Sequence, residues 1–206
     1  LYKMKRNLNQ KLINLIEYYN LIDANYLFSD KPLKRTVINV TAAFTGTKLE
    51  KLNKLKKKIL MIKNCDLKKN ATNLVFSDGN ISSKIMIIGE GPGANEDAEG
   101  KPFVGRAGKL LDKMLAAIKL DRKKVYISNV VNYRPPENRR PTEEEINRYL
   151  PYLVSHIEII NPKILLLLGS TALNALIGNE VVISKARGKW IQKKIGAINP
   201  WIIASF

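Results

Sequence analysis

The sequence predicts an α/β fold in which helices cover both faces of a central, mostly parallel four-stranded sheet, giving three αβα layers. Four short apolar runs predict the strands, and they lie at residues 85–88, 125–127, 164–168 and 201–203. Segments with helical spacing separate these runs. Because strands buried on both faces are apolar throughout, this alternation is typical of a parallel sheet between two helical layers. Such folds bind ligands beyond the carboxyl ends of their strands, so we expect the function to lie in the loops that follow these runs.

Residues 1–60 are predicted to form a basic, helical N-terminal extension. They are rich in Lys and Asn, and apolar residues recur at helical spacing at positions 8, 12 and 15 and again at 49, 52, 55 and 59. Pro32, Gly46 and small polar residues favour a flexible linker over residues 29–47. We therefore expect a partly flexible extension over residues 1–60 and a globular domain over residues 61–206.

Three helices are expected between the strands of the domain, at residues 107–119, 142–160 and 170–177. The second begins with Thr142 and Glu145, a capping-box pair in which each side chain accepts a backbone N–H from the other residue. The third ends before a glycine, the residue that most readily adopts the left-handed conformation of a helix C-cap. With the strands, these helices give a βαβαβαβ order.

The formal net charge of +17 predicts a polyanionic partner, nucleic acid first, because Lys and Arg neutralise phosphates. The alternative is that the many lysines only solvate the surface. The single cysteine, Cys65, excludes an internal disulfide and cannot by itself form a cysteine-ligated metal site. No apolar run approaches the roughly 20 residues of a membrane span, and the first residues lack a secretory signal, so we expect a cytoplasmic protein without a membrane segment.

The loop after the first predicted strand, residues 89–97, is the most informative segment of the chain. Its three glycines allow backbone to approach a ligand closely, whereas Glu90, Glu96 and Asp97 place negative charge where a phosphate cradle would be positive. A dinucleotide-binding loop would need a third glycine, where this chain has Ala94, and would continue directly into a helix. Both observations disfavour a nucleotide cofactor.

Several motifs together resemble family 4 uracil-DNA glycosylases, and related domains occur in phage DNA polymerase-associated proteins. The resemblance extends from about residue 62 to the end, and its motifs are residues 89–93 with Glu96 and Asp97, then 100–108, 125–131 and 134–136. It implies a monomeric enzyme of base-excision repair that hydrolyses the N-glycosidic bond of uracil flipped out of DNA. Uracil-containing DNA is then the expected partner.

The resemblance also implies a set of site residues. Glu90 would activate water or stabilise the sugar, with Asp97 as a reserve carboxylate that could instead hydrogen-bond the loop. Gly91 would line the base pocket, Phe103 would stack on uracil, and Asn129 would bind its Watson-Crick edge through both a donor and an acceptor. Taken singly, Phe103 is better explained by core packing and Asn129 by a strand-end turn, and only their joint placement favours the base pocket.

Four basic residues are expected to contact DNA phosphates by the same resemblance: Arg134, Arg139, Arg187 and Lys189. The alternative is that they are solvated loop charges.

The sequence departs from the family at the four cysteines that hold its 4Fe-4S cluster. The corresponding positions are Ile62, Cys65, Tyr133 and Tyr149. Since isoleucine and tyrosine supply no thiolate, we expect no cofactor in this chain and treat the positions as vestigial. We further expect Tyr133 and Tyr149 to be buried close to Ile62 and Cys65, where they would replace the cluster by packing.

A second departure concerns histidine. The family continues after its last strand with a His-Pro motif that contacts uracil, whereas this chain ends at Phe206 and begins with Leu1. Its only histidine, His156, falls inside a predicted helix and is expected to be a packing residue. We therefore expect a fragment, truncated at its C-terminal end, whose activity the missing motif impairs. The alternatives are a DNA-binding module of the same fold without catalysis, and a small-molecule enzyme that shares only the fold.

Overall fold

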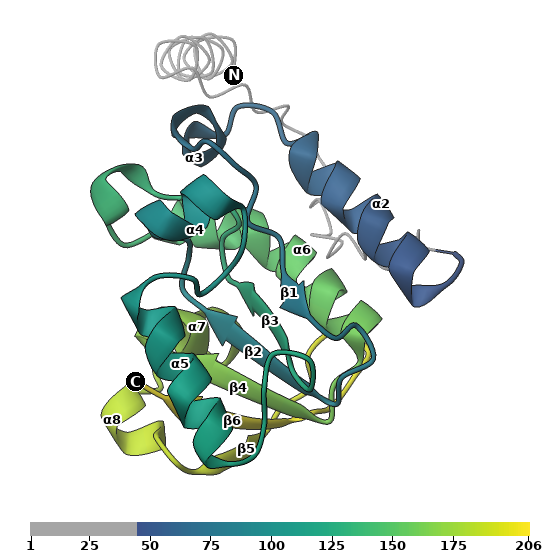
Figure 1. Cartoon of the computed structure of the whole chain (residues 1–206), viewed down its shortest axis with the longest axis vertical. Helices are drawn as coiled ribbons and strands as arrows, with labels where there is room; N and C mark the ends of the chain where they lie inside the picture. Colours follow the sequence, from purple (N-terminus) through teal and green to yellow (C-terminus); the bar gives the residue numbers. More distant parts are fainter. Residues whose placement is uncertain (1–44) are drawn as a thin grey trace, which may run out of the picture. The chain divides into compact units, whose positions relative to one another are not determined.

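The computed structural model describes residues 45–206, and all structural statements below concern this range. It contains one six-stranded sheet with the strand order β1-β3-β2-β4-β6-β5 (Figure 1). The four inner strands run parallel, as predicted, and they are β2 (Ile85–Gly89), β3 (Tyr126–Asn129), β4 (Ile164–Leu168) and β6 (Trp201–Ser205).

The sheet is wider than the predicted four strands, because a short antiparallel strand is added at each edge. β1 (Asp78–Gly79) pairs with β3, and β5 (Trp190–Gln192) pairs with β6. These strands have two and three residues, too few to show an alternating pattern in the sequence.

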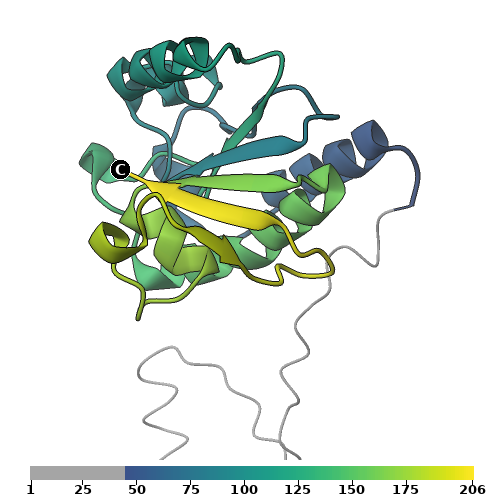
Figure 2. The same cartoon turned by 90° about the horizontal axis from the view of Figure 1, so that it is seen from below.

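Helices cover both faces of the sheet, so the predicted three layers are confirmed (Figure 2). On one face, α5 (Arg106–Ala117) packs Leu111 and Leu115 against Ile87 and Ile127 of the sheet. On the other face lie α6 (Glu143–Ile160) and α7 (Ser170–Leu176). Four short elements were not predicted: α3 (Asp66–Asn70), α4 (Ala94–Glu99), the 3-10 helix η2 (Pro136–Asn138) and α8 (Ile183–Ala186).

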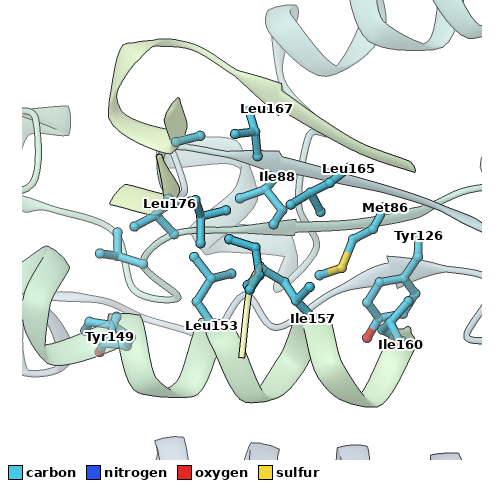
Figure 3. Packing of buried hydrophobic residues seen from close by; sticks show 14 of the residues in the cluster. Met86, Ile88, Tyr126, Tyr149, Leu153, Ile157, Ile160, Leu165, Leu167 and Leu176 are labelled. Atoms are coloured by element: carbon cyan, nitrogen blue, oxygen red, sulfur yellow. The ribbon is translucent and has the colours of Figure 1, made fainter. Parts of the chain in front are cut away.

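The predicted capping box of α6 is present. Thr142 accepts a hydrogen bond from the backbone N–H of Glu145, and the Glu145 carboxylate accepts one from the backbone N–H of Thr142 at 2.8 Å. The helix ends at Asn161, which has the left-handed conformation. Along α6, Leu153, Ile157 and Ile160 face the sheet (Figure 3).

The main core lies between α6 and the sheet. Figure 3 shows Leu153 and Ile157 pointing toward Met86 of β2 and Leu165 of β4, and all four side chains are buried. Complete burial of an aliphatic side chain of this size contributes about 1.5–3 kcal/mol. The packing fixes β2 and β4 firmly, and thereby the loops that leave their carboxyl ends.

α2 (Lys48–Leu60) belongs to the same core as the sheet. It packs against α6, and its buried Leu52, Leu55 and Ile59 join the main hydrophobic cluster. The helix predicted around positions 8–15 and most of the predicted linker fall outside the described residues. An extension over residues 1–60 therefore stays a prediction, although its last helix shares the core of the domain. No helix within residues 45–206 is long and apolar enough to cross a bilayer.

Candidate functional site

A cavity of about 400 Å³ opens where β2 and β3 end. Parallel strands expose unpaired backbone at this edge, and the loops that follow them converge there. The cavity is lined by residues of the loop after β2, the first turns of α4 and α5, the end of β3 and η2: Gly91, Gly93, Ala94, Asn95, Glu96, Phe103, Gly105, Arg106, Ala107, Asn129 and Asn138. Its volume suits a small, flat organic group.

The ring of Phe103 and the amide of Asn129 converge over Gly89. In the parallel register Gly89 lies beside Asn129. A Cβ atom on Gly89 would be 2.4 Å from Phe103 Cζ and 2.7 Å from Asn129 Oδ1, closer than non-bonded atoms approach. Glycine thus allows the Phe103 ring and the Asn129 amide to border one cavity, and their roles in binding a base stay predictions. Gly91 also lines the cavity, and a Cβ there would be 2.8 Å from Val131 Cγ2.

Glu96 ties together the two loops that form the cavity walls. Its Oε2 accepts a hydrogen bond from the backbone N–H of Gly93 at 3.1 Å. Its Oε1 accepts from Val104 at 2.9 Å and from Gly105 at 2.7 Å. Glu96 is one of the acidic residues that disfavour a phosphate cradle in this loop, and its role is therefore structural. The sequence did not indicate this role, because the partners are eight and nine residues away.

Glu90 lies just after β2, and its half-exposed carboxylate is oriented by a threonine from α7. The Thr171 hydroxyl donates to Glu90 Oε2. Arg140 Nε donates to Thr171 Oγ1 at 2.9 Å and lies 3.9 Å from Glu90 Oε2. Because Arg140 occupies an acceptor site of the hydroxyl, the threonine proton is directed toward the carboxylate. Both contacts reach the same oxygen of Glu90, which is not among the residues that line the cavity. Neither Thr171 nor Arg140 was among the predicted site residues.

Asp97 has a different environment. Its side chain is buried, and its carboxylate accepts hydrogen bonds from the backbone N–H groups of Thr72 (2.9 and 3.1 Å) and Asn73 (3.0 Å). The Asn73 amide also donates to the Asp97 carbonyl at 2.7 Å. Of the two roles considered for Asp97, this geometry matches the one that joins loops, since its carboxylate fixes residues 72–73 to α4.

The four residues expected to bind phosphates differ in their surroundings. Arg134 donates from Nε to Asn138 Oδ1 at 2.8 Å, which brings it next to the cavity lining. Arg139 is engaged in a two-point ion pair with Glu145, at 2.6 and 2.8 Å, and this hydrogen bonding lowers the pKa of Glu145. Arg187 and Lys189 are exposed in the segment after α8. Arg134 therefore has the clearest geometric link to the cavity.

The side chains at the four positions that correspond to the family's cluster ligands all contribute to the main hydrophobic core. Cys65, Tyr133 and Tyr149 are all buried, and Cys65 Sγ lies 3.4 Å from Tyr149 Oη. Ile62 packs, half-buried, against the same hydrophobic cluster. Burial raises the pKa of both tyrosines, so they are neutral phenols. Tyr133 and Tyr149 are thus buried as expected, and their replacement of a cluster by packing stays a prediction.

A 4Fe-4S cluster does not fit these residues. Such clusters are held by about four thiolates, and this region offers one. Within residues 45–206 the buried Tyr133 hydroxyl has no hydrogen-bond partner, and a phenol is not a ligand that such clusters use. No group of three or more His, Cys, Asp or Glu side chains within residues 45–206 is arranged to hold a metal ion.

His156 has a packing role, as predicted, and it lies in the core. Its ring stacks on Phe76 with centroids 4.5 Å apart, and its Nε2 is 2.8 Å from Tyr126 Oη. The Tyr126 hydroxyl donates to Ser77 Oγ at 2.7 Å, so the histidine must supply the proton of the first bond. Complete burial lowers the pKa of His156 to about 3, which keeps the ring neutral at physiological pH.

Comparison with known proteins identifies a family and several relatives of this chain. Residues 76–206 match the family described as the Uracil DNA glycosylase superfamily. The type-4 uracil-DNA glycosylase of Thermotoga maritima is 49% identical over 125 residues, which are 60% of this chain and 65% of that protein. The type-4 enzyme of Archaeoglobus fulgidus is 43% identical over 145 residues, covering 68% and 73% of the two chains. A DNA polymerase of Bacillus phage SP01 is 38% identical over 112 residues, 54% of this chain and 12% of the polymerase.

Proposed function

Since this chain belongs to the uracil-DNA glycosylase superfamily, we propose that it excises uracil from DNA by hydrolysing the N-glycosidic bond. The observation that carries the proposal is the convergence of Phe103 and Asn129 over Gly89 in one cavity. A base turned out of the helix loses its stacking neighbours, and an aromatic ring replaces them. The N–H donor and the oxygen acceptor of a side-chain amide form hydrogen bonds with the edge of that base.

Asn129 supplies the selectivity in this proposal. Its amide nitrogen donates to uracil O4, and its amide oxygen accepts from uracil N3–H. Cytosine has a donor and an acceptor at these positions in the reverse order, so with the amide in this orientation it leaves both groups of Asn129 mismatched. Because Asn129 is 97% buried, an unpaired amide there has little water to compensate it. Gly89 keeps this edge open by placing no side chain in front of it.

Glu90 supplies the charge for bond cleavage. As the bond between the sugar C1′ and uracil N1 breaks, the sugar becomes cationic and uracil leaves as an anion. The oxygen of Glu90 that Thr171 does not hold stabilises this cation or accepts the proton of the attacking water, whose oxygen bonds to C1′. We assign Asp97 a structural role instead, because backbone N–H groups of residues 72 and 73 already bind its buried carboxylate.

No step of this mechanism uses an iron-sulfur cluster. The type-4 family carries such a cluster, and the residues at the four positions of this chain do not fit one. In the family the cluster joins separate segments, and here we propose that the contact between Cys65 and Tyr149 performs the same joining.

Arg134 is proposed to contact a DNA phosphate beside the cavity, since its hydrogen-bond partner Asn138 lines that cavity. Three further phosphate contacts stay predictions, those by Arg139, Arg187 and Lys189. The monomeric state and the cytoplasmic location also stay predictions.

Excision from a single-stranded oligonucleotide with one uracil tests the proposal. Released uracil and the alkali-labile abasic site are measured for the parent chain and for Glu90→Gln and Phe103→Ala. The parent is expected to release uracil, and each variant to lose at least about tenfold in rate, the loss expected for one transition-state contact. Glu143→Gln is the matched control for Glu90, because Glu143 is an exposed carboxylate in the first turn of α6. DNA binding without base release by the parent would instead support the DNA-binding module.

A further inference from the structure

The backbone of Phe103 is held in an unusual conformation. Its φ of +56° lies in the left-handed region, which a bulky side chain rarely adopts. The segment is also pressed against the first turn of α5, where a Cβ on Gly108 would be 1.7 Å from the Phe103 carbonyl oxygen. A conformation of this kind persists only when surrounding contacts impose it. The direction of the Phe103 ring therefore depends on whatever holds its backbone.

Arg122, in the loop between α5 and β3, makes those contacts. Its guanidinium donates to the carbonyl of Pro102 at 3.1 Å and to the carbonyl of Phe103. Two carboxylates hold the guanidinium in turn: Asp112 Oδ1 is 2.8 Å from Nε, and Asp78 Oδ2 is 2.9 Å from Nη1. A planar fork with five N–H donors can serve all four acceptors at once, which a lysine cannot do.

The loop is thus clamped from both sides. Glu96 accepts the two N–H groups that follow Phe103, and Arg122 donates to the carbonyls of Pro102 and Phe103 itself. Between these anchors the only large side chain that reaches the cavity is the ring of Phe103. If Arg122 is lost, two carbonyls lose their donors and the left-handed φ has less to maintain it. The ring then leaves its place over Gly89.

We propose that Arg122 is a positioning residue that sets the Phe103 ring for stacking on the flipped base, an inference that rests on the proposed function. Arg122 itself touches no substrate. A phosphate contact, the other obvious role for an arginine in this protein, is disfavoured by its surroundings. Asp78 and Asp112 neutralise its charge, and its side chain is only 25% exposed.

A double-mutant cycle between Arg122→Gln and Phe103→Ala tests the proposal. Arg122→Gln is expected to lower kcat/KM for uracil excision by about 10- to 100-fold, the loss typical of a group displaced by about 1 Å. In the Phe103→Ala background, where there is no ring to position, the same substitution should cost less than about threefold. Arg122→Lys should recover little activity, because an ammonium cannot span both carbonyls.

Arg148→Gln is the matched control. Arg148 also donates from Nη1 to the backbone carbonyls of two successive residues, Lys63 (3.4 Å) and Asn64, but in a loop outside the cavity lining. Its loss should lower the melting temperature without lowering excision. Equal losses on excision for Arg122→Gln with and without Phe103, or parent-like excision by Arg122→Gln, would overturn the proposal.

Hydrogen exchange separates this inference from the proposed function. The amides of Val104 and Gly105 should exchange faster in Arg122→Gln than in the parent, and at the parent rate in Arg148→Gln. If the parent excises no uracil, the proposed function fails, and unchanged exchange at these two amides would overturn the positioning role independently.

Discussion

Replacing Gly89 by alanine should abolish most activity while leaving the fold intact. Gly89 is the last residue of β2 and has no positive φ, so alanine fits its backbone. The new methyl group would be 2.4 Å from Phe103 Cζ, 2.8 Å from Phe103 Cε2 and 2.7 Å from Asn129 Oδ1. Carbon atoms in contact are about 3.5–4.0 Å apart, so the ring must move by roughly 1 Å. One methyl group therefore displaces both side chains that we propose to bind uracil.

A displacement of this size at a reactive site lowers the rate by about 100-fold. Overpacking also costs about 1–3 kcal/mol of unfolding free energy. Steady-state excision of uracil and denaturant unfolding measure the two effects separately. Combining Gly89→Ala with Phe103→Ala removes one of the two clashes, so the double variant should lose less stability than the sum of the single changes. A Gly89→Ala protein with the kcat/KM of the parent would refute the geometry on which the site rests.

Three further predictions concern stability, metal content and DNA binding. The pKa of His156 is about 3 in the folded protein and near 6.5 when unfolded, so the unfolded chain binds more protons between these values. Unfolding free energy should be at its full value above pH 6.5 and fall by about 1.4 kcal/mol per pH unit below it; a His156→Phe variant that unfolds with the same pH dependence would contradict this. Protein purified without oxygen should be colourless and iron-free, and stoichiometric iron with a cluster absorption band would show that ligands other than Cys65 suffice. Affinity for duplex DNA should fall steeply with salt and depend little on sequence, given the net charge of +17, and binding that ignores ionic strength would exclude phosphate contacts as its source.

The parallel core could be predicted because its signal is local. The runs at residues 85–88 and 164–168 are apolar throughout, as strands buried on both faces must be, and β2 and β4 lie there. The edge strands β1 and β5 could not be predicted, because pairing with the end of a longer strand defines them and composition does not. Boundaries of helices were accurate where a capping box marks them, as at Thr142.

The site was predictable only in part, for a similar reason. Phe103 and Asn129 belong to recognisable motifs, and the structure brings them together. The residues that orient the site gave no signal, because their partners are distant in sequence: Thr171 lies 81 residues from Glu90, and Arg122 lies 19 residues from Phe103. Neither residue stands out in the sequence, because its role depends on contacts that form only in the folded chain.

Base release from two otherwise identical oligonucleotides decides whether this chain reads uracil through Asn129. One oligonucleotide carries a single uracil and the other a single cytosine at the same position, and the ratio of the two release rates is measured. The parent should release uracil far faster than cytosine, whereas Asn129→Asp should lower the ratio by about 10- to 100-fold, since a carboxylate accepts from the cytosine amino group and no longer donates to uracil O4. An unchanged ratio in Asn129→Asp, or no uracil release by the parent, would contradict the account.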